Sequence, residues 1–151
     1  MLRLALVLAS IVWPLTLGAA VAVRVRGAEP IWTDVIYVAA SRVCHQRPER
    51  SFHTAGVQWP VCGRCAGLYL SAPIGALAAW LARRRAPRMR APFWLAIAAL
   101  PTVLTLGLEW LDLARVTNID RALAALPLGA AIAFVIVAIA DARARPAIHF
   151  P

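Results

Sequence analysis

Three cysteines and their histidine neighbours are the residues of this sequence best suited to site chemistry. Cys44 is followed at once by His45, and Cys62 and Cys65 form a CxxC pair in the run WPVCGRCAGLY. Thiolate and imidazole are the donors that Zn²⁺ prefers, and four-coordination suits three cysteines plus one histidine. The pattern therefore predicts a zinc site formed by Cys44, His45, Cys62 and Cys65, with His53 as the alternative fourth ligand.

The same cysteines fit two further interpretations. A CxxC at the start of a helix places its first thiol, Cys62, near the positive end of the helix dipole and beside Arg64, which favours the nucleophilic thiolate. The chain would then be a membrane thiol-disulfide oxidoreductase linked to a quinone, with Cys62 and Cys65 as the redox pair and Cys44 as the shuttle thiol. In the third interpretation the protein is structural or binds a partner, and the cysteine loop only plugs the end of a helix bundle. The sequence leaves these alternatives open.

The elements that must position these residues are those of a membrane protein. Hydrophobic residues make up 62% of the chain, charged residues 15%, and the mean hydropathy is +0.71, outside the usual composition of soluble proteins. Four apolar runs are long enough to cross a bilayer, and in hydrocarbon they must be helices to satisfy their own backbone groups. The predicted spans are 4–23, 65–82, 91–108 and 122–140.

These spans predict an all-α integral membrane bundle of four transmembrane helices, with the Cys/His motif in a loop, residues 40–65, between the first two. The chain has no room for a second soluble core, so residues 1–151 are predicted to form a single membrane domain. The first run is expected to stay as a helix, because its apolar core exceeds the roughly 7–15 residues of a secretory signal. Residues 31–43 carry apolar side chains at helical spacing and predict a short surface helix that leads into Cys44.

The arginines predict how the protein is oriented. All sixteen basic residues are arginine, and the net charge of +9 would suggest nucleic acid in a soluble chain, but here they lie at helix ends and in loops. Five of them fall in the connection Arg83–Arg90, which the positive-inside rule assigns to the cytoplasm. We therefore expect a multi-pass protein of the cell membrane with an extracytoplasmic motif loop, the lipid bilayer as partner, and no nucleic acid.

A polar stretch after the third span is predicted to lie beside the motif, because the second span starts where the third ends. Glu109, Asp112 and Arg115 are spaced by three and form a polar stripe on a continuing helix. Ionisable groups near membrane depth usually pair with one another or have a function. The predicted partners of Glu109 and Asp112 are Arg64 and Arg50.

The run CHQRPERSFHTAGVQWPVCGRCAGLYL resembles the signature of a family of small membrane proteins known as domain of unknown function 2085. The resemblance covers roughly residues 40–130 and departs at the third span, where Glu109 and Trp110 replace an Asp-Gly pair. It implies a membrane setting, and no established activity comes with it. The matching residues are Cys44, His45, Pro48, Arg50, Ser51, Phe52, Gly56, Pro60, Val61, Cys62, Arg64, Cys65, Gly67 and Tyr69, followed by Thr117, Asn118 and Arg121.

Overall fold

Four long helices form the body of the protein. The computed structural model describes residues 1–82 and 91–144, so the predicted arginine-rich connection 83–90 lies outside the described residues. The helices are α1 (Leu2–Val25), α3 (Gly63–Ala82), α4 (Ala91–Trp110) and α5 (Asn118–Ala144). Each is long and apolar enough to cross a membrane, which confirms the predicted all-α class and its four spans.

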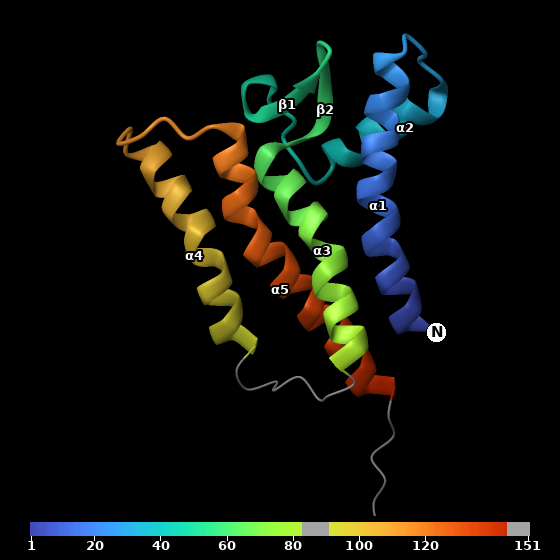
Figure 1. Cartoon of the computed structure of the whole chain (residues 1–151), viewed down its shortest axis with the longest axis vertical. Coiled ribbons are helices and arrows are strands. Elements are labelled where there is room, and N and C mark those ends of the chain that lie inside the picture. The colour runs from blue at the N-terminus through green and yellow to red at the C-terminus, as the bar shows by residue number, and fades with distance from the viewer. Residues whose placement is uncertain (83–90, 145–151) are drawn as a thin grey trace, which may run out of the picture.

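The helices are longer than the predicted apolar runs at one or both ends, because backbone hydrogen bonding continues past the last apolar residue. α3 thus begins at Gly63, between the two cysteines of the CxxC pair, and α5 begins at Asn118 rather than at residue 122. Figure 1 shows that the end of α1, the start of α3, the end of α4 and the start of α5 lie at the same end of the bundle. The motif loop lies at this end as well.

Helices α3 and α5 form the central pair, and glycines let their backbones approach closely. A Cβ atom on Gly67 would overlap the backbone of Ala122, and one on Gly75 would overlap that of Ala130. From the other side, a Cβ on Gly129 would collide with the backbone of Leu68. Small residues at such positions allow the van der Waals contact that associates helices in membranes.

The two outer helices pack on this pair in different ways. α1 buries Leu17 in a cluster with residues of the motif, and it buries Val7 in a second cluster with residues of α3 and α5. α4 has no buried residue and lies beside α5, where the Thr102 hydroxyl donates a 2.9 Å hydrogen bond to the carbonyl of Ala124. Most of the surface of α4 is therefore left to face lipid.

The connection between α1 and α3 is more structured than a loop. It contains α2 (Ile31–Ser41), close to the predicted surface helix, a 3-10 turn η1 (Pro48–Arg50), and an antiparallel hairpin of β1 (Ser51–Thr54) and β2 (Val57–Cys62). The hairpin is not predicted by the sequence. Its two-residue turn has φ angles of 49° at Ala55 and 80° at Gly56, both in the left-handed region that tight hairpin turns require.

The close approach of α3 and α5 makes a prediction about stability. Replacing Gly75 by alanine should lower the free energy of unfolding by about 1–3 kcal/mol, because the added methyl group overlaps the Ala130 backbone. The measurement is unfolding of the detergent-solubilised protein with increasing dodecyl sulfate. The matched control is Gly107→Ala on α4, where a Cβ has no atom within 4 Å. Equal stability of the two variants would contradict the tight packing.

Candidate metal centre

The three cysteines converge at the end of the bundle. The sulfur atoms of Cys44, Cys62 and Cys65 all lie within 4.8 Å of one another, and all three cysteines are free. Cys44 and Cys62 are buried, with exposed fractions of 7% and 5%, whereas Cys65 is half-buried. The Cys62 amide N–H donates a 3.2 Å hydrogen bond to the Cys44 sulfur. Sulfurs from two separate stretches of the chain thus meet in one place.

A polar network holds the Cys44 stretch against the hairpin. The Gln46 side-chain amide donates hydrogen bonds to the carbonyls of Tyr37 (2.8 Å) and Pro60 (2.7 Å). The Gln58 amide donates to the Gln46 carbonyl at 2.6 Å, and the Tyr37 hydroxyl donates to the Gln58 carbonyl at 2.5 Å. Neither glutamine is predicted as a site residue, and their only sequence signal is that both lie inside the motif. These hydrogen bonds hold the segment between α2 and the hairpin against β2.

The CxxC pair is positioned where β2 becomes α3. Cys62 is the last residue of β2, and Cys65 lies in the first turn of α3. Gly63 between them is buried, and a Cβ there would overlap the carbonyl oxygen of Asn118 at the start of α5. The glycine therefore lets the CxxC turn seat directly on α5.

The surroundings of the sulfurs are apolar. Cys44 and Cys62 belong to a buried cluster with Leu17, Ala40, Val61 and Ala66, and Trp13, Ile36, Phe52, Cys65 and Tyr69 pack against it. The Cys65 thiol donates a hydrogen bond to the Cys62 sulfur and so holds the pKa of Cys62 well below its usual range, although burial opposes the shift. A lowered pKa favours the thiolate, which is the form that binds metal or attacks a disulfide.

Neither predicted histidine ligand joins the sulfur cluster. His45 is exposed, and its Nδ1 atom accepts a 3.1 Å hydrogen bond from the Arg47 amide N–H. His53 is exposed on β1, opposite Gln58. The structure therefore brings together three of the four predicted ligands. A neutral ring whose Nδ1 accepts a hydrogen bond carries its proton on Nε2, so His45 can bind a metal ion only after this hydrogen bond is broken.

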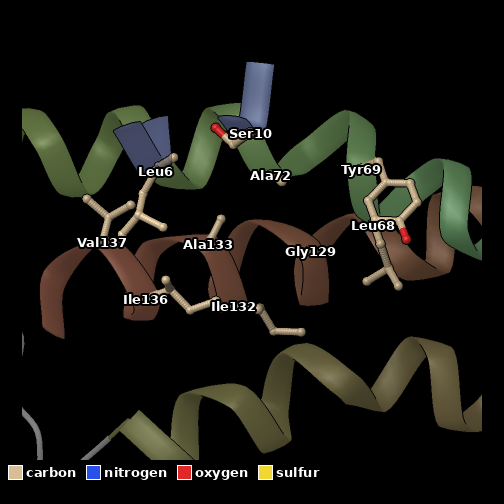
Figure 2. A pocket seen from close by; sticks show the side chains of 11 residues that line it. Leu6, Ser10, Leu68, Tyr69, Ala72, Gly129, Ile132, Ala133, Ile136 and Val137 are labelled. Atoms are coloured by element: carbon tan, nitrogen blue, oxygen red, sulfur yellow. The ribbon is translucent and has the colours of Figure 1, made fainter. Parts of the chain in front are cut away.

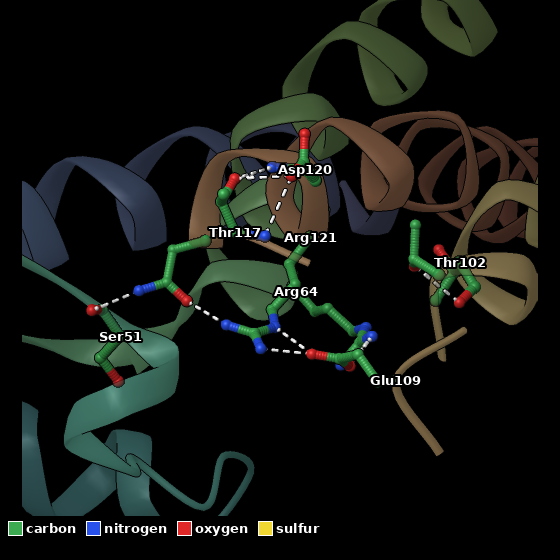
Figure 3. Close-up of polar contacts among 9 residues, drawn as sticks. Ser51, Arg64, Thr102, Glu109, Thr117, Asp120 and Arg121 are labelled. Atoms are coloured by element: carbon green, nitrogen blue, oxygen red, sulfur yellow. Dashed lines mark hydrogen bonds and ion pairs between the residues drawn. The ribbon is translucent and has the colours of Figure 1, made fainter. Parts of the chain in front are cut away.

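A second polar group lies beside the cysteines and ties three helices together. Arg64 donates a 2.5 Å hydrogen bond to one carboxylate oxygen of Glu109, and Arg121 binds the other through its Nε atom at 2.7 Å. Arg121 also donates to the Asn118 side chain, whose amide in turn donates to the Ser51 carbonyl at 2.9 Å. Figure 3 shows this chain of contacts from the hairpin to α4.

The network differs in part from the predicted ion pairs. Arg64 lies against Glu109 as predicted, but the second arginine on this carboxylate is Arg121, in place of Arg50. Arg121 lies one turn into α5, which starts earlier than the apolar run that defined the predicted span. Asp112 is exposed in a turn with φ 52° and forms no ion pair within the described residues.

An apolar cavity approaches the cysteine cluster from the membrane side. It has a volume of about 280 Å³ between α1, α3 and α5, and Ser10 and Tyr69 are the polar side chains in its lining. Figure 2 shows Tyr69 at one end of the cavity and Leu6 and Val137 toward the other. Tyr69 also packs against the cluster that contains the cysteines, so it lies between the cavity and the site.

These features define a multi-pass helical membrane protein that carries three clustered cysteines at one end of its bundle. Residues 44–135, more than half of the chain, match the family described as Predicted membrane protein (DUF2085). The chain belongs to this family. The match begins at Cys44 and runs through the hairpin, α3 and α4 into α5.

Two archaeal proteins share short segments with the chain. An uncharacterized protein of Methanothermobacter thermautotrophicus is 53% identical over 30 residues, which are 20% of this chain and 27% of that protein. An uncharacterized protein of Methanocaldococcus jannaschii is 42% identical over 40 residues, which are 26% of each chain. The matched segment spans about a quarter of each relative's length. No solved structure matches the chain.

The Arg64–Glu109–Arg121 group makes a prediction about stability. The three side chains are 16%, 8% and 12% exposed, so removing the shared negative charge leaves two largely buried guanidinium groups without their counter-ion. Glu109→Gln should lower the free energy of unfolding by about 3–5 kcal/mol. Asp112→Asn removes an exposed carboxylate on the same side of the bundle and should change stability by less than about 0.5 kcal/mol. A Glu109→Gln variant as stable as Asp112→Asn would show that the pairs contribute nothing.

Proposed function

We propose that this protein is a zinc-binding membrane protein whose metal is held by Cys44, Cys62 and Cys65 at one face of the bilayer. The proposal rests on one observation, the mutual approach of the three sulfurs to within 4.8 Å. Two sulfurs on one tetrahedral zinc ion lie about 3.8 Å apart, because each zinc–sulfur bond is about 2.3 Å long, so the sulfurs need to move together by about 1 Å at most. Small side-chain adjustments therefore suffice to bring three thiolates onto one ion.

The proposed fourth ligand is His45, with His53 as the alternative. His45 follows Cys44 directly, and a rotation of its side chain that breaks the hydrogen bond from the Arg47 amide to Nδ1 would free a ring nitrogen to bind the metal. His53 lies two residues after Ser51, which is paired with Cys62 in the hairpin. Zinc bound by three cysteines and a histidine is a closed, structural arrangement, which would fasten the hairpin to the helices.

A second candidate function is that of a membrane thiol-disulfide oxidoreductase in which a quinone oxidises the cysteines. The low pKa of Cys62 and the cavity that ends at Tyr69 favour it, because a lipid-soluble acceptor needs an apolar route to the thiols. In this reaction Cys62 and Cys65 form a disulfide and release two protons and two electrons, which reduce the quinone to a quinol. Cys44 would then act as the shuttle thiol: it attacks the Cys62–Cys65 disulfide and releases one of these two thiols, and an outside dithiol substrate next reduces the Cys44 mixed disulfide and leaves as a disulfide. The zinc proposal has the stronger geometric support because it uses all three sulfurs at once.

We further propose that the chain is a single membrane domain with its motif loop outside the cytoplasm. The support is the density of arginine in residues 83–90, at the connection between α3 and α4. An oxidising exterior also bears on the chemistry, since neighbouring thiols that an oxidant can reach form disulfides there unless a metal holds them.

Metal analysis tests the proposed function. Protein purified in detergent under reducing conditions should contain about one zinc ion per chain, measured by inductively coupled plasma mass spectrometry. The Cys62→Ser variant should lose this zinc, because the two remaining sulfurs hold zinc weakly. Ser71→Ala, a buried substitution on α3 outside the cluster, is the control. A metal-free protein with a reversible Cys62–Cys65 disulfide would favour the redox function. If neither is found, and Cys62→Ser behaves as the wild type, only a structural or partner-binding role is left.

The histidines provide a paired comparison. If His45 is the fourth ligand, His45→Ala should raise the zinc dissociation constant by more than the roughly 10- to 100-fold that loss of an outer-shell partner costs. His53→Ala should then leave it within a few-fold of the wild type. Competition with a chromogenic chelator measures both constants. The reverse ranking would assign the ligand to His53, and equal, small effects would rule out both.

Reporter fusions test the orientation. Alkaline phosphatase fused after Arg90 should be inactive, and the same enzyme fused after Ala114 should be active. The two fusion points flank opposite ends of the span α4, and the phosphatase folds only outside the cytoplasm. The opposite pattern would place the motif loop in the cytoplasm without changing the metal proposal.

A further inference from the structure

Helix α2 is too short to cross the bilayer and lies across α1. Its 11 residues extend about 16 Å, against the roughly 30 Å of the hydrocarbon core. Figure 1 shows α2 crossing α1 rather than continuing along it. The helix therefore lies closer to the plane of the membrane than to its normal.

The contacts of α2 with α1 give its depth. Ile36 and Ala40 pack in the same cluster as Leu17, and the Arg24 side chain donates a 3.3 Å hydrogen bond to the buried Thr33 hydroxyl. Leu17 and Arg24 lie in the second half of α1, which is itself a candidate membrane span from Leu2 to Val25. A helix beside these turns lies at the boundary between hydrocarbon and headgroups, and not above it.

The positive charge of Arg24, near the end of α1, is paired with side chains of α2. Arg24 forms an ion pair with Asp34, and its guanidinium group lies over the Tyr37 ring, 4.0 Å from the ring centroid. Arginines near membrane depth need such partners or a path to the interface. The pairing thus fits a helix that is seated in the interface.

The opposite face of α2 is apolar and exposed. Ile31, Val35 and Val38 lie at i, i+4 and i+7, and they are 81%, 57% and 59% exposed. Trp32 is 44% exposed beside them, and tryptophan is a common residue at membrane interfaces. Asp34 and Arg42 line a shallow hollow on this face together with apolar side chains of the same helix.

We propose that α2 is an interfacial helix whose exposed apolar face is embedded among the phospholipids of the bilayer. The depth set by α1 selects lipid as the occupant, because the surface at this level continues directly into the lipid-facing surface of a membrane span. The Cys44 amide N–H donates a 2.9 Å hydrogen bond to the Ala40 carbonyl in the last turn of α2. The anchor therefore also holds Cys44 below the headgroup surface, whether or not the cysteines bind a metal.

Photocrosslinking tests this assignment. Benzoylphenylalanine is placed at Val38, and separately at Val35, in protein reconstituted in vesicles of phosphatidylcholine and phosphatidylglycerol. Illumination should give phospholipid adducts, seen as a mass increase of one lipid, in several-fold higher yield than the same label at Ala55 in the hairpin turn. Both valines are exposed, so the label needs no space in the core.

Each other product would overturn the proposal. Covalent dimers at Val35 and Val38 would show that a second copy covers this face, and adducts to another protein after labelling in cells would show a protein partner. A lipid yield no higher than that at Ala55 would place α2 in water. Because the two valines are labelled in separate variants, failure of one variant to fold leaves the other as the test.

Discussion

The close backbone contact between α3 and α5 is the constraint on which the rest of the structure depends. The backbone of α5 occupies the space where Cβ atoms of Gly63, Gly67 and Gly75 would lie, so α3 has one register and one depth relative to α5. α3 starts within the CxxC pair, and fixing its first turn therefore fixes Cys62 and Cys65. The hairpin, which ends at Cys62, is then held over the start of α5 by the Asn118–Ser51 hydrogen bond.

The buried ion pairs add the fourth helix to this arrangement. α4 has no buried residue of its own, so apolar packing holds it weakly, and Glu109 attaches its end to Arg64 on α3 and Arg121 on α5. One carboxylate between two guanidinium groups leaves a net charge of +1 at the end of the bundle that also holds the cysteines. A divalent metal with three thiolates carries a net charge of −1, and a nearby positive charge lowers the cost of burying it. The proposed metal site and the ion pairs are in this sense electrostatically complementary.

The sequence predicts the four spans and the side of the bundle that holds the motif. The features that it does not predict, among them the hairpin and the position of His45, have physical causes. Hydropathy predicts the four spans because bilayer thickness sets their length, and consecutive spans place Glu109 on the same side as the motif. The hairpin is not predictable in the same way, since four- and six-residue strands with Ala-Gly at the turn lack the usual Asn-Gly signal. The sequence does not predict Arg121 as the partner of Glu109, because α5 begins before the apolar run that marks the span. The exposed position of His45 depends on the chain direction at Cys44, which spacing alone does not determine.

The three cysteines could be charged thiolates, protonated thiols, a disulfide with one free thiol, or metal ligands. The fact that three sulfurs meet, and not two, helps to decide among these states. Three thiolates in an apolar pocket cannot all stay charged without compensation, since each uncompensated buried charge costs several kcal/mol. Protonation removes the charge but gives no reason for the sulfurs to meet. A disulfide joins two of them and leaves the third as a buried thiol. Of these states only a bound metal ion engages all three sulfurs at the same time, and the Cys62 amide N–H that donates to the Cys44 sulfur helps to hold this third sulfur in place. The meeting of all three sulfurs is therefore the main support for the proposed metal site.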